Sequence, residues 1–315
     1  MVNFAISGVA GYIAPRHLKA INETNNELIA ALDPHDSVGI IDRFAPRARF
    51  FKAPERFDRH LEKLRRKGEK YRMHWFSICS PNYLHDAHVR MAFRLNANAI
   101  CEKPLVLNPW NLDALQELEE ETGRRVWNVL QLRLHPSIKA LKARIDNERP
   151  RDKYDIELTY ITPRGPWYLI SWKGNANHSG GLATNIGVHF YDMLIWVFGP
   201  VEHSEVHMSQ PTRTCGYLEL EKARVRWFLS IDMQDAAAFS GSAQPSSHRV
   251  FKINDQQINF SDGFSDLHTE LYRRTLAGKG FGIDDVRPSI QLIRNLRIAE
   301  PIGISANSHP FVRGR

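Results

Sequence analysis

In the N-terminal part of the chain, short apolar runs alternate with segments whose apolar residues recur at helical spacing. This alternation is typical of strand–helix–strand units, in which helices cover both faces of a parallel sheet. The pattern predicts strands at residues 3–7, 28–32, 74–79, 97–101 and 125–129. It predicts helices at residues 14–24, 54–66, 84–95 and 109–122. We therefore expect an α/β fold with a doubly wound parallel sheet in this part of the chain.

The pattern changes after a helical segment at residues 135–147. Ile156, Leu158 and Tyr160 alternate with polar neighbours, which predicts a strand with one buried face. Further strands are expected at residues 201–209 and 216–232, followed by a hairpin around residues 254–256. These elements predict a second, α+β domain with a large, mainly antiparallel open sheet.

Two domains are expected for 315 residues, because a single compact core rarely grows to that size. We place the first domain at residues 1–127 and the second at residues 128–315. Residues 235–247, which are rich in Ala, Ser, Gly and Pro, are predicted to form a mobile loop. The chain is expected to finish with helices at residues 266–276 and 284–300.

Composition and charge narrow the possible functions. No apolar run approaches the roughly 20 residues of a membrane span, and the first strand starts without a signal-peptide pattern, so we expect a soluble, cytoplasmic protein. The formal net charge of +7 suits nucleic acid, an anionic small molecule or an ordinary soluble surface. The most basic run, residues 59–72, is interrupted by Glu62 and Glu69, which favours a solvated helix face over a nucleic-acid surface.

A turn rich in small residues, with Gly8, Gly11 and Ala14 at regular spacing, joins the first strand to the first helix. Small residues let the backbone approach a pyrophosphate, and the amides at the helix start favour its negative charge. The spacing departs by one residue from the usual dinucleotide motif, and such turns also occur as plain packing geometry. Asp33 follows about twenty residues later, where a carboxylate binds both ribose hydroxyls of NAD and repels the 2′-phosphate of NADP. A helix cap before Pro34 is the alternative reading of Asp33.

Two further motifs follow strands whose carboxyl ends meet at the same edge of the sheet, where doubly wound folds bind ligands. The first contains Ser80, Asn82 and His85, of which Asn82 suits both a helix cap and a cofactor contact. The second is Glu102-Lys103-Pro104. An ammonium at Lys103 can stabilise developing alkoxide character as a hydride leaves the neighbouring carbon. A solvated turn is the structural alternative for this lysine.

His189 lies in the segment 181–192, which contains several small residues. An unperturbed imidazole titrates near a pH of about 6.5, so it can accept a hydroxyl proton and return it in the reverse direction. A buried, satisfied histidine is the alternative. Asp192, one helical turn later, either orients His189 or has an ordinary structural role.

Together, the motifs at residues 8–14, 80–82, 102–104, 131–136 and 181–189 resemble the family of glucose-fructose oxidoreductase, inositol dehydrogenase and rhizopine catabolism proteins. The resemblance implies an NAD-binding Rossmann domain followed by an open-sheet domain. The residues that it assigns to the cofactor are Gly8, Gly11, Ala14, Asp33, Ser80, Asn82, His85, Glu102 and Gln131. It implies that Lys103 and His189 flank the reacting carbon of a sugar. Asn185 stands where many members have an aspartate, and an amide orients a neighbour without supplying charge.

A narrower resemblance, over residues 8–17, 31–42 and 164–174, is to bacterial UDP-N-acetylglucosaminuronate 3-dehydrogenases. It implies oxidation of the carbon-3 hydroxyl to a ketone for surface polysaccharide (O-antigen) biosynthesis, with NAD as oxidant. It also implies that 2-oxoglutarate regenerates NAD, that an aminotransferase consumes the keto sugar, and that the protein is a homo-oligomer, either dimer or tetramer.

Side chains in the second domain suit such an anionic substrate. Arg164 and Lys173 can bind a carboxylate or a diphosphate, although single cations are often plain surface charges. Tyr160 and Tyr168 can stack on uracil or sugar, and packing in the protein interior explains them equally well.

Other functions remain open. His203, Glu205 and His207 share one face of a predicted strand and form a possible metal site, but an exposed polar face explains them as well and we predict no metal. The alternatives to the nucleotide-sugar enzyme are a dehydrogenase of a free sugar or polyol, such as inositol, and a non-catalytic NAD-binding regulator. A nucleic-acid binder is disfavoured, because the sequence shows no helix-turn-helix or stacking platform.

Overall fold

The computed structural model describes residues 1–148, 151–241, 246–258 and 266–314. The chain divides into two compact units. Unit 1 comprises Met1–Gln131 and Ser265–Arg287, and unit 2 comprises Leu132–Phe264 and Pro288–Arg315. The chain therefore returns to the first unit after most of the second has been built.

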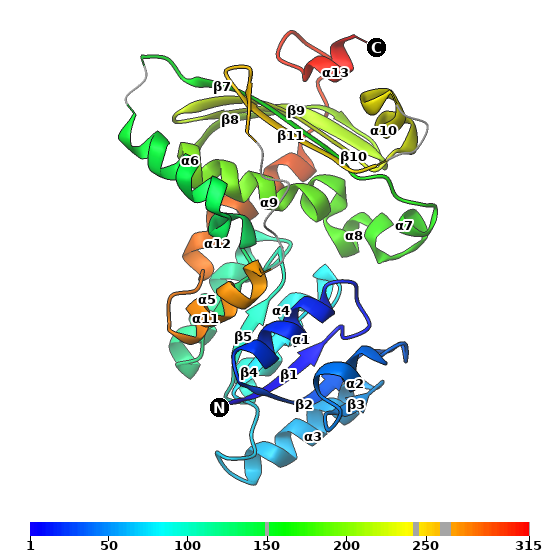
Figure 1. Ribbon diagram of the computed structural model, residues 1–315, viewed down its shortest axis with the longest axis vertical. Coiled ribbons are helices and arrows are strands. Elements are labelled where there is room, and N and C mark those ends of the chain that lie inside the picture. The colour runs from blue at the N-terminus through cyan, green and yellow to red at the C-terminus, as the bar shows by residue number, and fades with distance from the viewer. Residues whose placement is uncertain (149–150, 242–245, 259–265, 315) are drawn as a thin grey trace. The chain divides into compact units, whose positions relative to one another are not determined.

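Unit 1 is built on a six-stranded sheet in the order β3-β2-β1-β4-β5-β6, with every neighbouring pair parallel (Figure 1). The strands are β1 (Asn3–Ser7), β2 (Glu27–Leu32), β3 (Arg49–Phe51), β4 (Trp75–Ile78), β5 (Asn98–Cys101) and β6 (Val126–Asn128). This order reverses direction between β1 and β4, which is the point where doubly wound sheets open a crevice for a ligand. The predicted Rossmann sheet is confirmed.

The helices of unit 1 follow the strands in the crossover pattern of this fold. They are α1 (Ala14–Glu23), α2 (Ile40–Phe44), α3 (Pro54–Arg66), α4 (His85–Arg94) and α5 (Pro109–Thr122), with a single 3-10 turn, η1 (Asn82–Leu84), before α4. Prolines occupy the first turns of α1, α3 and α5, where a missing amide hydrogen costs nothing. The short elements β3 and α2 were not predicted, because three and five residues are too few to establish a period.

Unit 1 also contains α11 (Leu267–Leu276), which lies in the range 128–315 that we assigned to the second domain. This helix packs on α1. Tyr272 from α11 is fully buried and stacks on Phe4 of β1, with ring centroids 5.8 Å apart. The linear order of the sequence cannot show that a late helix completes an early core.

Unit 2 is built on a second six-stranded sheet in the order β12-β11-β7-β10-β9-β8. The strands are β7 (Tyr154–Ile161), β8 (Val201–Ser209), β9 (Arg213–Leu220), β10 (Ala223–Ser230), β11 (His248–Ile253) and β12 (Gln256–Gln257). All neighbouring pairs are antiparallel except β7 with β10, so the mainly antiparallel prediction is confirmed. The long helix α9 (Gly181–Phe198) lies along one face of this sheet (Figure 1), and its Tyr191 contacts Trp227 of β10 edge to face.

The other helices of unit 2 are short or lie at its margins. They are α6 (Pro136–Asn147), α7 (Trp167–Ile170), α8 (Ala176–Ser179), α10 (Met233–Ser240) and α13 (Pro310–Arg313), with the 3-10 turns η2 (Gln131–Leu134) and η3 (Trp172–Gly174). The helix α12 (Ile283–Ile298) begins in the part of the chain assigned to unit 1 and ends in the part assigned to unit 2.

The prediction of a mobile loop over residues 235–247 is wrong for its first half. Met233–Ser240 forms α10, which starts with the Asp232 side chain accepting a hydrogen bond from the Gln234 amide at 2.8 Å. Ala236 is buried against the sheet in a cluster with Phe228 and Val312. Alanine is a strong helix former. The helix was not predicted because serine and glycine follow the alanines and give the whole segment a loop-like composition. Residues 242–245 of this range lie outside the described residues.

Two general features concern the described residues only. None of their helices combines the length and apolarity needed to cross a bilayer. The three cysteines are buried and free, and burial raises the pKa of the Cys79 and Cys101 thiols well above the ordinary value.

Candidate functional site

The glycine turn after β1 is tightly packed. Gly8 has a φ of 74°, and a Cβ at this position would lie 2.3 Å from the backbone oxygen of Cys79, so only glycine fits. The Gly11 amide donates to the Gly8 carbonyl at 3.0 Å, and the Ala14 amide donates to the Gly11 carbonyl at 3.1 Å. These bonds lead the chain directly from the strand into α1.

The start of α1 favours an anion. Its N-cap residue, Ile13, supplies no side-chain cap, and the first turn contains no acidic residue. The amide ends of this helix therefore retain their positive character, which suits a pyrophosphate. The geometry of this turn fits the dinucleotide predicted from the sequence.

Asp33, at the end of β2, is joined to the same turn. One carboxylate oxygen accepts from the Ala10 amide at 3.0 Å, and the other accepts from the His35 amide at 2.9 Å. The next helix, α2, has Gly39 as its N-cap, so Asp33 caps a local turn rather than a helix. A carboxylate has about four acceptor sites, so these two bonds leave capacity for ribose hydroxyls.

The segment after β4 is ordered by buried histidines. Ser80 and Ser7 both place their hydroxyls against the Nδ1 atom of His88, at 2.9 and 3.1 Å. Burial lowers the pKa of His88 to about 4, so its ring is neutral near pH 7. Asn82 is buried in η1. The role of His88 was not predicted, since a histidine inside a helical pattern gives no sign of its partners.

His85, predicted as a cofactor residue, joins two site loops. Its Nδ1 lies 2.7 Å from the carbonyl oxygen of Pro104, and its Nε2 lies 2.9 Å from that of Ser80. The ring is fully buried, which lowers its pKa. His85 thus connects the loop after β4 with the loop after β5.

The Glu102-Lys103-Pro104 turn follows β5, with a cis peptide bond between Lys103 and Pro104. The Glu102 carboxylate is buried and its Oε1 atom lies 3.0 Å from His17 Nε2 and 3.3 Å from His268 Nε2. Burial alone would raise the pKa of Glu102, but the hydrogen bonds of the two histidines hold it well below its usual range. Lys103 itself is half-buried. The contacts with His17 and His268 were not predicted.

In unit 2, α9 carries Asn185 and His189 one turn apart, and therefore on the same side of the helix. The Asn185 amide nitrogen donates to the hydroxyl of the buried Tyr168. His189 is half-buried.

Asp192, whose role the sequence left open, forms a buried ion pair with Arg133. The guanidinium donates through Nε and a terminal nitrogen to the two carboxylate oxygens, at 3.0 and 2.8 Å. Both side chains are more than nine-tenths buried. The geometry favours the structural interpretation of Asp192 and places the Arg133 guanidinium in the interior.

The predicted substrate residues of unit 2 gather near α7 and η3. The Lys173 ammonium lies 4.5 Å from the ring centroid of Trp172 and 5.5 Å from that of Trp167. Burial and the nearby Arg164 lower the pKa of Lys173. Burial raises the pKa of Tyr168, while the charge of Arg164 opposes the increase. The charge of Arg164 therefore acts on both Tyr168 and Lys173.

Tyr160, on β7, packs against α9. Its ring centroid lies 5.0 Å from that of Phe190, the residue after His189. The guanidinium of Arg249, on β11, stands 5.5 Å from the Tyr160 ring. Arg249 was not predicted, because the strand that carries it is distant in sequence from the other candidates.

The structure thus collects the candidates in two groups. In unit 1, the carboxyl edge of the parallel sheet and the loops that follow it carry Gly8, Gly11, Ala14, Asp33, Ser80, Asn82, His85, Glu102 and Lys103. Gln131, the last residue of that segment of unit 1, is half-buried. In unit 2, Asn185 is bonded to Tyr168 and lies one turn from His189. Convergence of Lys103 with His189 involves both units and stays a prediction.

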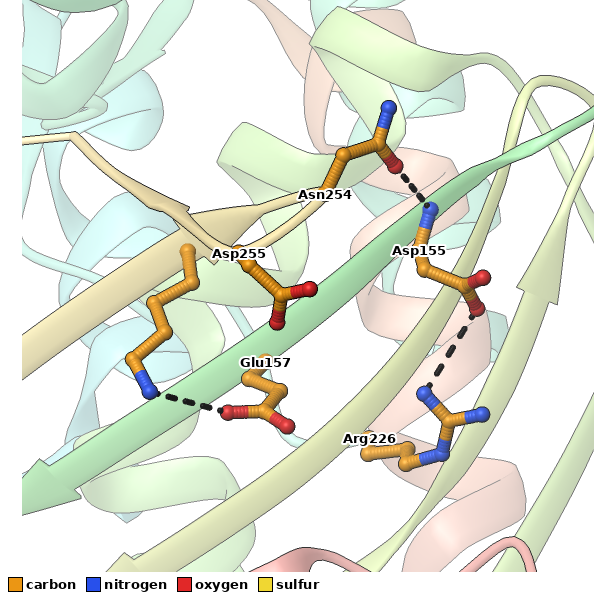
Figure 2. Close-up of a pocket in the computed structure, with 6 residues that line it drawn as sticks. Asp155, Glu157, Arg226, Asn254 and Asp255 are labelled. Atoms are coloured by element: carbon orange, nitrogen blue, oxygen red, sulfur yellow. Dashed lines mark hydrogen bonds and ion pairs between the residues drawn. The ribbon is translucent and has the colours of Figure 1, made fainter.

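A pocket of about 220 Å³ on the sheet of unit 2 has a different character (Figure 2). Arg226 pairs with Asp155 at 3.5 Å, and Lys252 pairs with Glu157 at 3.4 Å. These residues come from β7, β10 and β11, and they alternate with buried apolar residues of the same strands. The pocket is lined by cross-strand ion pairs and contains none of the predicted site residues.

The possible metal ligands on β8 are linked to one another by hydrogen bonds. Glu205 contacts His203 Nε2 at 3.0 Å through one oxygen and His207 Nε2 at 2.9 Å through the other. These bonds lower the pKa of Glu205. Within the described ranges, His17, Glu102 and His268 are the set whose possible ligand atoms all lie within 4.8 Å of one another.

The sequence matches one family in both units. Residues 2–129 match the model described as "Oxidoreductase family, NAD-binding Rossmann fold", and residues 152–237 match the model of that family's C-terminal alpha/beta domain. The chain belongs to this oxidoreductase family. It is therefore an NAD-dependent oxidoreductase, and the glycine turn, the uncapped start of α1 and Asp33 are the parts of unit 1 that fit NAD.

Among solved structures of family members, the WlbA (WbpB) dehydrogenase from Thermus thermophilus is 51% identical over 99% of this chain and 100% of its own, with a TM-score of 0.93. That enzyme has been crystallised with NAD and alpha-ketoglutarate, and with NAD and UDP-GlcNAcA. The WlbA dehydrogenase from Bordetella pertussis, at 18% identity over 94% of this chain and 96% of its own, has a TM-score of 0.75 and shares the fold.

Two curated relatives match over shorter stretches. The D-glucoside 3-dehydrogenase of Escherichia coli is 26% identical over 44% of this chain, and the putative oxidoreductase YteT of Bacillus subtilis is 24% identical over 36%. The matches span 41% and 27% of the lengths of those two proteins.

Proposed function

We propose that this protein oxidises the carbon-3 hydroxyl of UDP-N-acetylglucosaminuronic acid to a ketone, in a bacterial pathway to surface polysaccharide (O-antigen). The observation that carries the proposal is 51% identity over the full length of the Thermus thermophilus dehydrogenase, which was crystallised with NAD and UDP-GlcNAcA. The presence of Lys103 and His189 supports a catalytic rather than a regulatory protein.

NAD, when bound, accepts the hydride from carbon 3. The Lys103 ammonium donates a hydrogen bond to the carbon-3 oxygen and stabilises its growing negative charge. The His189 imidazole accepts the proton of that hydroxyl, and returns it when the reaction runs in reverse. This assignment requires Lys103 and His189 to converge on the same carbinol.

Asn185 acts through Tyr168 in this proposal. Because the Tyr168 oxygen accepts a hydrogen bond from the Asn185 amide, its own proton is directed elsewhere. We assign that proton to a substrate oxygen. A carboxylate at position 185 would instead accept from the tyrosine, so the amide changes the direction of this bond.

Arg164 and Lys173 are the proposed anion-binding residues. A sugar nucleotide of this type carries a carboxylate and a diphosphate, which suit a guanidinium and an ammonium. The aromatic rings beside Lys173 also offer a surface for uracil or sugar, as does Tyr160. The dianion 2-oxoglutarate suits the same cations, and we propose that its reduction to 2-hydroxyglutarate regenerates NAD.

Direct turnover tests the proposal. Purified protein incubated with UDP-N-acetylglucosaminuronic acid and 2-oxoglutarate should form the keto sugar and 2-hydroxyglutarate in equal amounts, measured by mass spectrometry. The matched control is the Lys103→Met variant, which should form both products on the order of a hundredfold or more slowly. Turnover of inositol, glucose or a glucoside, with none of the nucleotide sugar, would replace the proposal by a free-sugar dehydrogenase.

Three further proposals depend on the same function. We propose that the enzyme is cytoplasmic and that it is a homo-oligomer, either a dimer or a tetramer. We also propose that an aminotransferase acts next in the pathway, because a 3-keto sugar is the substrate that transamination requires. Light scattering gives the oligomer number. Coupled turnover with an aminotransferase and an amino donor should pull the oxidation forward.

A further inference from the structure

The residues on both sides of Lys103 are held by buried histidines, all within unit 1. On the N-terminal side, the Glu102 carboxylate lies between His17 and His268. On the C-terminal side, the Pro104 carbonyl oxygen lies 2.7 Å from His85. The function proposed above uses Lys103 but assigns no role to these three rings.

The donor and the acceptor in each hydrogen bond around Glu102 follow from the chemistry of the groups. The carboxylate is ionised and can only accept, so His17 and His268 each donate through Nε2. Burial lowers the pKa of His17 and keeps its ring neutral, so its Nδ1 must accept, and the Tyr272 hydroxyl at 2.7 Å must donate. Tyr272 in turn accepts from Ser77, at 2.6 Å. One chain of bonds therefore runs from β4 through α11 and α1 to Glu102.

The backbone around Lys103 is held at further points. The Lys103 amide lies 3.3 Å from the second carboxylate oxygen of Glu102. The Asn128 side chain donates to the Glu102 carbonyl at 3.1 Å. Both contacts of His85 face carbonyl oxygens, which only accept, and a neutral ring has one N–H. We assign that hydrogen to the shorter contact, with Pro104.

We propose that His17, His268 and His85 are positioning residues for Lys103, which hold the turn that carries it so that its ammonium is presented to the reacting hydroxyl. The inference rests on the function proposed for Lys103. Misplacement of a catalytic group by an ångström can lower the rate by a large factor. Fixing the turn on both sides of Lys103 therefore contributes to catalysis as well as to stability. None of the three rings needs to touch the substrate or NAD.

The Tyr272→Phe variant tests the chain at a distance. The substitution removes the donor to His17 and keeps the ring that stacks on Phe4. We expect kcat to fall about five- to tenfold, the worth of roughly one net hydrogen bond, with KM and the Kd of NAD within about twofold of wild type. Thr269→Val is the matched control, because it removes a buried hydroxyl of the same helix that bonds to Glu23 and is not bonded to Glu102. It should lower Tm by a similar amount and leave kcat unchanged.

A second pair of variants, at His85, tests the Pro104 side of Lys103. This test does not depend on whether Tyr272→Phe folds. His85→Asn keeps a donor near the position of Nδ1, whereas His85→Leu removes it. We expect the asparagine variant to retain kcat within about threefold and the leucine variant to lose about tenfold. Equal kcat values for the two, at equal Tm, would overturn the role of His85.

The decisive measurement repeats Tyr272→Phe in a Lys103→Met background. If Tyr272 acts through the lysine, the second substitution has nothing left to misplace and the residual rate stays constant. The same fold-loss in both backgrounds overturns the inference and leaves the proposed function intact. Full activity of Lys103→Met alone overturns the catalytic role proposed for Lys103, on which the inference rests.

Metal analysis of the purified protein completes the test. His17, Glu102 and His268 offer three possible ligand atoms within 4.8 Å of one another, which a zinc ion could also use. The hydrogen-bond chain leaves no place for such an ion, so we expect no stoichiometric metal. One equivalent of zinc per chain would overturn the positioning role in favour of a metal centre.

Discussion

Replacing Asp192 with asparagine should strongly destabilise unit 2. Asp192 and Arg133 form two charge-assisted hydrogen bonds, at 2.8 and 3.0 Å, and both side chains are more than nine-tenths buried. The substitution keeps the shape of the side chain and removes the carboxylate charge that faces the buried guanidinium through these two bonds. Breaking a buried ion pair in this way costs about 3–5 kcal/mol.

That free energy corresponds to a large shift in melting temperature. For a unit of this size, each kcal/mol lowers Tm by about 2–4 °C, so we expect a decrease of roughly 6–20 °C. Thermal unfolding followed by tryptophan fluorescence provides the measurement. Asp86→Asn is the matched control, because its ion pair with Arg90 is partly exposed and lies on one helix, and such pairs contribute at most about 0.5 kcal/mol.

The activity of the same variant separates the two roles considered for Asp192. If the residue is structural, kcat measured well below the new Tm stays within a few-fold of wild type. A variant with an unchanged Tm and a kcat reduced by on the order of a hundredfold would refute the reasoning. In that case the main role of Asp192 would be to orient His189 and not to pair with Arg133.

Four other substitutions follow from the site. Lys103→Met and His189→Ala should each lower kcat by on the order of a hundredfold or more while NAD still binds, as measured by calorimetry and steady-state kinetics; retained turnover in either would remove that residue from the mechanism. Asp33→Ser should weaken NAD about tenfold and raise the relative affinity for NADP, and an unchanged ratio of the two Kd values would contradict the ribose contact. His88, whose pKa is about 4, binds a proton in the unfolded chain below pH 6.5 but not in the folded one, so Tm should fall from pH 6.5 towards pH 4, and more steeply in wild type than in His88→Gln. Parallel Tm curves would rule out this source of acid sensitivity.

Much of unit 1 could be predicted from local patterns. Strand ends in a parallel sheet share one edge, so residues after separate strands, such as Asp33, Ser80 and Lys103, could be grouped without knowledge of the fold. The apolar spacing of Leu112 and Leu115 identified α5 in the same way, and the two residues are buried. These features depend on short stretches of chain, in which sequence spacing and spatial spacing agree.

Contacts across long sequence separations could not be predicted. His17 bonds to Tyr272, 255 residues away, and Glu102 bonds to His268, 166 residues away. Histidine and tyrosine in helical segments carry no sign of their partners, since many buried arrangements satisfy them. The same limit applies to Arg133 and Asp192, which are 59 residues apart.

The amide at position 185 leads to a final prediction about proton transfer. A carboxylate one helical turn before His189 would stabilise the imidazolium and raise its pKa, whereas Asn185 adds no charge. His189 must be neutral to accept the hydroxyl proton, so activity is lost as the pH falls below its pKa. Asn185→Asp should therefore move the acidic limb of the kcat/KM profile to higher pH, by about one unit for a partly solvated pair.

The variant Asn185→Ser provides the control, because it removes the amide without adding charge. Its acidic limb should stay at the wild-type pH, while kcat falls through the lost bond to Tyr168. An unshifted limb in Asn185→Asp would mean that His189 is not the group whose ionisation limits the rate. If the acidic limb of Asn185→Asp shifted only at low salt, the new carboxylate would be exposed to solvent. Exposed charges are screened within about 10 Å at 0.1 M salt.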